Sequence, residues 1–447
     1  MEKNLTTGSV WKNIVSFSLP YLLSYFLQTL YGMADLFIIG QFDGVGNITA
    51  VSIGSQVMHL LTVVIVGLAM GTTVTIGHSI GADDKKRASA VIGNTVTLFM
   101  AVAVVFTVVL IGFVNPIVSV MSTPQEAVEG TKIYLTICFI GIPFITAYNI
   151  ISSIFRGMGD SKSPMYFIAV ACGVNIVLDC LFMGVFHMGA AGAALGTTLS
   201  QTVSVIVSLL VIRKKQTGIR IRKSDLKPDR EIMGQILKIG IPVALQDGFI
   251  QIAFIIITVI ANRRGLNDAA AVGIVEKIIS VVFLVPSSML STVSALAAQN
   301  VGAGKYDRAD MTLKYAIMIT VTYGFIISVL TQFAAEGLVG MFADDTEVIR
   351  LGGQYLRGYI WDGMFAGVHF CFSGYFCAFG LSFISFIHNS LSVVLMRVPG
   401  AYFASKMFAD TLFPMGIATT FGSILSIVIC LIAFVWMKKS GKAAVQV

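Results

Sequence analysis

The sequence predicts an all-α membrane protein with twelve transmembrane helices in two six-helix lobes related by pseudo-two-fold symmetry. Three observations predict this fold class. Of the 447 residues, 56% are hydrophobic and 12% are charged, which is too apolar for a soluble globule of this length. Uncharged runs long enough to cross a bilayer recur along the chain, and the second half of the sequence repeats the first.

Twelve stretches fit the hydrocarbon core of a bilayer, which is about 30 Å thick and takes roughly 20 helical residues to cross. The polar residues 1–12 run directly into a span that is too long for a signal peptide, so we expect the first helix to stay in the mature protein. The predicted spans are residues 13–40, 49–80, 89–114, 127–155, 163–185, 190–212, 231–261, 270–300, 311–335, 347–378, 382–404 and 412–437.

The basic residues predict the orientation. With an even number of spans both termini share one side, and the loops of that side hold most of the 30 Lys and Arg residues. The opposite side has Lys132, Arg263, Arg264, Arg350, Arg357 and Lys406. By the positive-inside rule, we expect a multi-pass protein of the plasma (inner) membrane with both termini cytoplasmic. The basic excess follows these loops and therefore indicates a lipid bilayer, with no nucleic acid as partner.

An internal repeat predicts the two lobes. The motif GADDKKRA at Gly81–Ala88 recurs as GAGKYDRA at Gly302–Ala309, 221 positions later, and the register holds over more than a hundred residues. Each repeat has six spans, so the lobes share one topology, as in transporters with a central cleft. We predict an N-terminal lobe at 1–212, a cytoplasmic basic linker at 213–230 and a C-terminal lobe at 231–447. The linker is expected to be a solvated join near anionic headgroups.

Asp35 is a lone acid in the first span, LPYLLSYFLQTLYGMADLFIIG. A charge inside a membrane costs several kcal/mol, so it usually marks an ion or substrate path; the alternative is an acid held at a helix end. Pro20 and Gly32 loosen the same helix and make it a candidate hinge. In the fifth span Asn175 and Asp179 are four residues apart, so they share one helix face.

The second lobe has a different set of polar residues within its spans. Arg397 lies near a helix end and has two readings, a site residue or an anchor that reaches the membrane surface. The candidates are Gln246, Asp247, Glu276, Asp362 and Arg397.

Other chemistries have little support. The five histidines form no HExxH cluster, and no GxxxxGK[ST] loop for ATP is present. The six cysteines lie within apolar runs without metal-ligand spacing. We therefore expect no cofactor, and an integral-membrane enzyme is the least favoured class.

In combination, several motifs resemble the multidrug and toxic compound extrusion (MATE) family, in its bacterial DinF-like type, over essentially the whole chain. They are the first-span proline with ADLFIIG, the GADDKKRA loop, FRGMGDSKSP after the fourth span, NIVLD in the fifth, GAAGAALGTT opening the sixth, and VPSSMLSTVSALAAQNVGAGKYDRA in the second half. The second half has CAFGLS where FRGMGDS would recur, so the resemblance is richer in the first lobe.

The resemblance implies a monomeric secondary antiporter that exports organic cations or drugs in exchange for H⁺ or Na⁺. It makes Asp35 the principal coupling acid, completed by Asn175 and Asp179. Gln28, Tyr134 and Thr197 occupy the positions of polar neighbours of that site.

Some relatives place a sodium site in the second lobe instead. By that resemblance Na⁺ binds either at Asp35, Asn175 and Asp179 or near Asp362, where Asp247 or Glu276 would help. A flippase of lipid-linked precursors from the same superfamily stays open as an alternative. The intramembrane acids favour cationic cargo, because a proton and a cation compete for a buried carboxylate.

Overall fold

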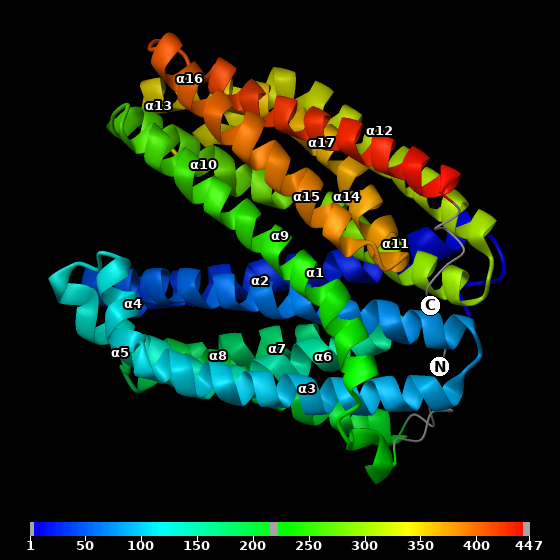
Figure 1. Ribbon diagram of the computed structural model, residues 1–447. Helices are drawn as coiled ribbons and strands as arrows, with labels where there is room; N and C mark the ends of the chain where they lie inside the picture. The colour runs from blue at the N-terminus through cyan, green and yellow to red at the C-terminus, as the bar shows by residue number, and fades with distance from the viewer. Residues whose placement is uncertain (1–3, 215–221, 441–447) are drawn as a thin grey trace. The chain divides into compact units, whose positions relative to one another are not determined.

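The computed structural model describes residues 4–214 and 222–440, and every regular element in these ranges is a helix (Figure 1). The all-α prediction is confirmed. The first repeat forms α1 (Val10–Phe42), α2 (Val45–Gly81), α3 (Lys85–Gly112), α4 (Val114–Val120), α5 (Gln125–Ile140), α6 (Ile142–Gly157), α7 (Lys162–Asp179), the π-helix η1 (Cys180–Val185) and α8 (Gly189–Lys214). The linker contains the 3₁₀-helix η2 (Lys223–Leu226).

The second repeat has the same order of spans. It forms α9 (Arg230–Asn262), α10 (Leu266–Val282), α11 (Leu284–Gly302), α12 (Tyr306–Gly340), α13 (Thr346–Tyr359), α14 (Asp362–Ala378), α15 (Ser382–Ser392), the π-helix η3 (Val393–Arg397), α16 (Val398–Met407) and α17 (Phe413–Lys439). Each predicted span therefore corresponds to one helix or to a run of consecutive helices.

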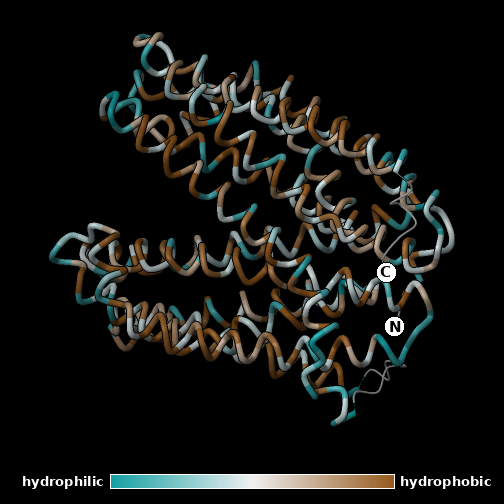
Figure 2. Tube along the Cα trace, viewed as in Figure 1, coloured by the Kyte–Doolittle hydropathy of each residue, from teal (hydrophilic) through white to brown (hydrophobic). Residues whose placement is uncertain are grey.

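Most of the spans are long and apolar enough to cross a membrane by themselves. In the described ranges nine helices meet this condition, and α5 with α6, bent by 50°, make a tenth span. The remaining predicted spans, 347–378 and 382–404, are helical but built of shorter pieces, α13 with α14 and α15 with η3 and α16. Hydrophobic residues follow the helices and hydrophilic ones gather at their ends (Figure 2). Large apolar side chains such as Val108 and Phe333 are 67% and 87% exposed, as a lipid-facing surface requires.

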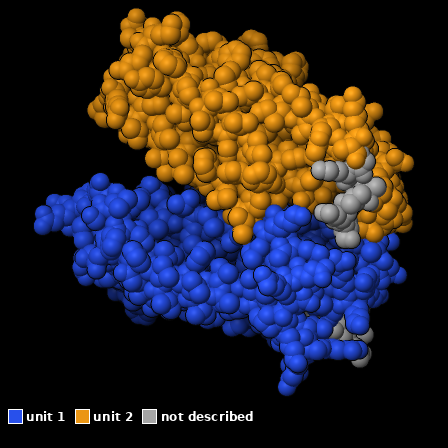
Figure 3. Space-filling model, viewed as in Figure 1, with its two compact units in different colours: residues 1–4, 19–240 blue, residues 5–18, 241–447 orange. Residues whose placement is uncertain are grey.

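The chain divides into two compact units (Figure 3). Unit 1 contains Met1–Asn4 and Leu19–Gly240, and unit 2 contains Leu5–Ser18 and Ile241–Val447. The divisions thus fall inside α1 and α9 and not in the linker, whereas the repeat predicts that the N-terminal lobe ends at residue 212 and the C-terminal lobe begins at residue 231. The predicted lobe boundaries stay a prediction.

Equivalent spans pack in the two units. In unit 1, α2 contacts α5 and α6 and α7 contacts α8; in unit 2, α11 contacts α14, α10 contacts α13, and α17 contacts α15, η3 and α16. Glycines permit the close approaches, as at membrane helix interfaces. A Cβ on Gly71 would lie 2.0 Å from the Ile236 carbonyl oxygen, and one on Gly374 would lie 2.2 Å from that of Leu290. Substitution at either glycine would therefore push two helices apart.

The second half of the linker is exposed but anchored to α3. Ser89 Oγ donates to Asp225 Oδ2 at 2.8 Å, Thr97 Oγ1 donates to the Leu226 carbonyl at 2.8 Å, and the Asn94 side chain accepts from the Asp229 amide at 2.7 Å. Most of residues 222–229 are exposed, as expected of a solvated join, and these hydrogen bonds in addition fix the segment to α3. Residues 215–221 of the predicted linker lie outside the described ranges.

The segment before α1 is anchored in the same manner within unit 2. The Leu5 amide donates to Gln299 Oε1 at 3.1 Å, Lys305 Nζ donates to the Thr6 carbonyl at 3.0 Å, and Arg308 donates to the Gly8 carbonyl at 3.0 Å. The anchoring residues belong to the end of α11 and the start of α12, which repeat the α2–α3 turn.

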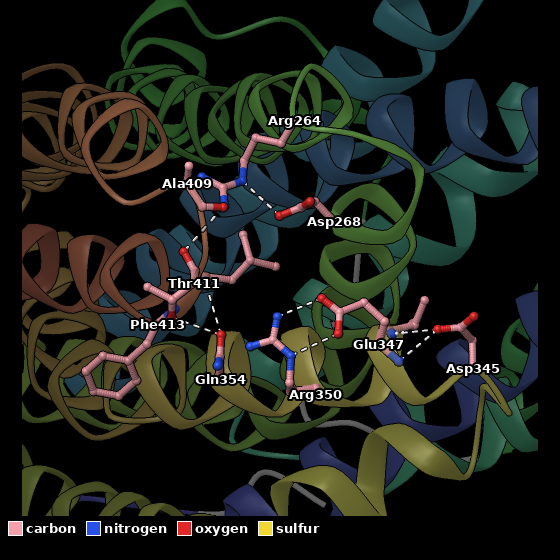
Figure 4. A network of polar contacts seen from close by, with 11 residues as sticks. Arg264, Asp268, Asp345, Glu347, Arg350, Gln354, Ala409, Thr411 and Phe413 are labelled. Atoms are coloured by element: carbon pink, nitrogen blue, oxygen red, sulfur yellow. Dashed lines mark hydrogen bonds and ion pairs between the residues drawn. The ribbon is translucent and has the colours of Figure 1, made fainter.

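At the other end of unit 2, polar contacts tie loops together (Figure 4). Arg264 donates to Asp268 at 2.8 Å and to the carbonyls of Ser405 and Ala409, each at 2.7 Å. A cation that meets the last carbonyls of a helix also opposes the negative end of the helix dipole. Arg264 therefore fastens the α9–α10 turn to the end of α16.

Candidate functional site

Asp35 of α1 is almost completely buried, with 3% of its surface exposed. Thr197 of α8 donates its hydroxyl to Asp35 Oδ2 at 3.2 Å, and Oδ1 has no hydrogen-bond partner among the described residues. Asp35 lies seven residues before the end of α1, so the reading as an acid held at a helix end is not supported.

Asn175 and Asp179 of α7 are fully buried and face the same stretch of α8. A Cβ added to Gly196 would lie 2.0 Å from Asp179 Oδ1 and 3.6 Å from Asn175 Nδ2. The glycine therefore gives these two side chains access to the α8 backbone. The next residue in α8 is Thr197, which binds Asp35.

The three predicted coupling residues thus converge on Gly196 and Thr197. The carboxyls of Asp35 and Asp179 lie within electrostatic range of each other and of Asn175, although no hydrogen bond of good geometry joins Asp179 to either. Both Asp179 oxygens and both polar atoms of the Asn175 amide lack partners in the described part of the chain. Buried polar atoms are costly without partners. A proton or a hard cation bound by these oxygen donors would remove that cost.

The predicted neighbours divide into three cases. Thr197 contacts Asp35 directly. Tyr134 is buried, and its hydroxyl pairs with Ser55 at 3.1 Å. Gln28 is partly exposed, and no hydrogen bond to it is found within residues 4–214 and 222–440.

Tyr31 is a site residue that sequence reasoning missed. Its hydroxyl donates to the Thr197 carbonyl at 3.3 Å and lies 3.3 Å from Ser200 Oγ. Its position one helical turn before Asp35 was the available signal, because residues four apart share a helix face.

A π-turn follows the site residues of α7. The helix changes to η1 directly after Asp179. Short π-segments within α-helices often mark functional sites.

In unit 2, Asp362 and Arg397 form a buried ion pair, in which the guanidinium Nη2 donates to Asp362 Oδ2. Asp362 is fully buried and Arg397 is 6% exposed. Arg397 therefore does not reach the membrane surface as an anchor, and a role for it as a site residue stays a prediction.

The other candidates of unit 2 do not all gather at this pair. Glu276 accepts a hydrogen bond from Thr258 at 3.2 Å. Gln246 bonds weakly to its neighbour Asp247, at 3.5 Å.

Two buried tyrosines of α13, Tyr355 and Tyr359, were not predicted as site residues. Their rings are 5.5 Å apart, and both hydroxyls are buried without partners among the described residues.

Comparisons with known proteins agree with this architecture. The family model MatE matches residues 20–181 and again 242–403, so the second match begins and ends 222 positions after the first. The chain is 27% identical to the probable multidrug resistance protein YoeA of Bacillus subtilis over 98% of this chain and 96% of that protein. It is 29% identical to the probable multidrug resistance protein YpnP of the same organism over 94% of each.

Solved structures show the same fold. A crystal structure described as MATE in the bent conformation superposes with a TM-score of 0.90 at 25% identity, covering 99% of this chain and 98% of that one. A structure described as MATE in the straight conformation has a TM-score of 0.90 at 24% identity and covers 99% of each chain. Since the family model matches twice over most of the sequence, the chain belongs to the MatE family of multidrug efflux transporters and is a multi-pass membrane protein.

Proposed function

We propose that this protein is a secondary antiporter of the plasma membrane that exports organic cations or related drugs in exchange for H⁺ or Na⁺. The observation that carries the proposal is the buried group of Asp35, Asn175 and Asp179, in which all side-chain oxygens but Asp35 Oδ2 lack a partner in the described part of the chain. The names of the relatives, multidrug resistance and multidrug export proteins, support drugs as cargo.

The chemistry of this group supports competition between the coupling ion and a cationic drug for one binding site. Two carboxyls in electrostatic range cannot both be ionised easily in a dry site, so the pair takes up a proton or a cation readily. Thr197 stabilises the ionised form of Asp35 by its hydrogen bond. A cationic drug and the coupling ion would then exclude one another, which couples export to entry of the ion.

The membrane potential supplies part of the work if more positive charge enters than leaves in each cycle. An elementary charge that moves inward gains about 2.3 kcal/mol per 100 mV. We propose that both termini are cytoplasmic, that the protein acts as a monomer, and that α1 bends at Pro20 or Gly32 when the acids change charge. A related structure described as bent supports the last point.

The test is uptake of a fluorescent organic cation into inverted membrane vesicles under an imposed pH or sodium gradient. We expect Asp35→Asn to abolish gradient-driven transport while expression is kept, because the amide preserves size and polarity but does not titrate. Asp43→Asn is the matched control, since Asp43 directly follows α1 and its Oδ1 bonds to Asn47 at 2.8 Å. Undiminished transport by Asp35→Asn, or equal loss in both variants, would contradict the proposal.

A further inference from the structure

The acids of the two units have different surroundings. In unit 1 Asp35 accepts a hydrogen bond from Thr197, and among the described residues no Lys or Arg forms an ion pair with Asp35 or Asp179. In unit 2 the guanidinium of Arg397 contacts Asp362 directly and lies 3.5 Å from Ser423 Oγ. The second unit thus pairs its buried acid with a positive charge of its own.

This positive charge is permanent. Arginine does not lose its proton in proteins, and its planar donors match a carboxylate. A sodium ion that replaced it at Asp362 would leave a guanidinium buried and unpaired, which is strongly unfavourable. Protonation of Asp362 would leave the same unpaired charge. The pair therefore resists both candidate coupling ions.

The cavity beside the ion pair also disfavours binding of a cation. Its volume is about 30 Å³, and its polar lining residues are His369, Asn389, Ser392, Arg397 and Ser423. No carboxylate lines this cavity, and the buried atoms His369 Nδ1 and Arg397 Nε have no partner in the described ranges. A cation that entered would meet the guanidinium without an acid to bind it.

Local helix geometry holds Arg397 in place. It ends the π-helix η3, and η3 packs on α17, the helix of Ser423. Asp362 begins α14 directly after the break that follows α13. Both charges are therefore placed by irregular segments within spans, as is common at functional sites.

We propose that Arg397 is a built-in counter-cation that fills the cation position of unit 2, so that Asp362 becomes a sodium site only when Arg397 is removed. The coupling ion then binds at Asp35, Asn175 and Asp179. This last step rests on the proposed antiport, whereas the latent sodium site does not.

The test compares purified wild-type protein, Arg397→Gln and the double variant Asp362→Asn/Arg397→Gln. Thermal unfolding is measured in NaCl and in choline chloride at equal ionic strength. We expect Arg397→Gln to gain a saturable, sodium-dependent rise in Tm of about 3 °C or more beyond that of the other two proteins, because ligand binding to the folded state raises its stability. Any sodium bound in unit 1 raises the Tm of all three proteins equally, so its effect cancels in the comparison.

A single substitution can prevent folding, so the double variant supplies a second measurement. It removes both charges together, which is far less destabilising than removing one. We expect it to keep gradient-driven dye transport, because the pair takes no part in coupling. Loss of coupling in the folded double variant, or no sodium effect on Arg397→Gln, would overturn the proposal. Absence of dye transport in the wild type would overturn the proposed antiport and leave the sodium measurement valid.

Discussion

Gly196→Ala should uncouple transport while leaving the protein folded. The new methyl group would lie 2.0 Å from Asp179 Oδ1, so the carboxyl must move by more than 1 Å to reach an ordinary contact distance. The atom that moves is the end of a side chain and not backbone. We therefore expect a loss of about 1 kcal/mol in stability, at the low end for overpacking. Asp179 would lose its position against α8, and coupling should fall severalfold.

The matched control is Gly173→Ala in α7, where an added Cβ meets nothing within 4 Å. It should express and transport like the wild type, with a stability change within about 1 kcal/mol from helix propensity alone. Both variants are purified and compared by thermal unfolding and by dye efflux from proteoliposomes. If Gly196→Ala transports as well as Gly173→Ala, the placement of Asp179 against Gly196 has no part in coupling.

Three further outcomes are expected. Asn175→Ala and Asp179→Asn should each weaken coupling, and the double variant should lose less than the sum in a double-mutant cycle of efflux rates, because the two act on one site; additive losses would separate them. Pro20→Ala restores a backbone donor and should slow efflux while dye binding to the purified protein is kept; normal efflux would remove the hinge. The Arg222 amide and Ser89 lower the pKa of Asp225 from its ordinary value of 3.8, so this carboxylate stabilises the linker anchor above that pH and the effect is lost as the pH falls through the lowered pKa. Hydrogen exchange at residues 222–229 should therefore rise at strongly acid pH relative to its intrinsic rate, and Asp225→Asn should abolish the change.

Much of the fold could be predicted because membrane spans and repeats leave strong signals in sequence. The run 347–378 shows the limit of that signal. Glu347, Arg350 and Arg357 lower its hydropathy, and the structure divides it into α13 and α14. Breaks and π-turns depend on packing between helices, which the sequence alone does not reveal.

The candidate site was predicted unevenly for a similar reason. Asp35 and Asp179 stand out as acids within apolar runs, but Gly196 becomes important only because Asp179 packs on it. The ion pair of Asp362 and Arg397 joins residues 35 positions apart on different helices. Neither the contact of Asp179 with Gly196 nor the pair of Asp362 with Arg397 joins residues at a helical spacing, so sequence periodicity could not predict them.

The two compact units are divided at corresponding positions of α1 and α9, the first helices of the two repeats. The division between the compact units falls between Ser18 and Leu19 in α1 and between Gly240 and Ile241 in α9, and in each helix the second residue after the division is a proline, Pro20 or Pro242. A proline inside a helix removes one backbone hydrogen bond and weakens the helix there. The segment before α1 is hydrogen-bonded within unit 2, whereas α1 from Leu19 onward belongs to unit 1. The segment before α9 is hydrogen-bonded within unit 1, whereas α9 from Ile241 onward belongs to unit 2. A bend at Pro20, as proposed above, would therefore leave the anchor before α1 intact, and Pro242 occupies the corresponding place in α9.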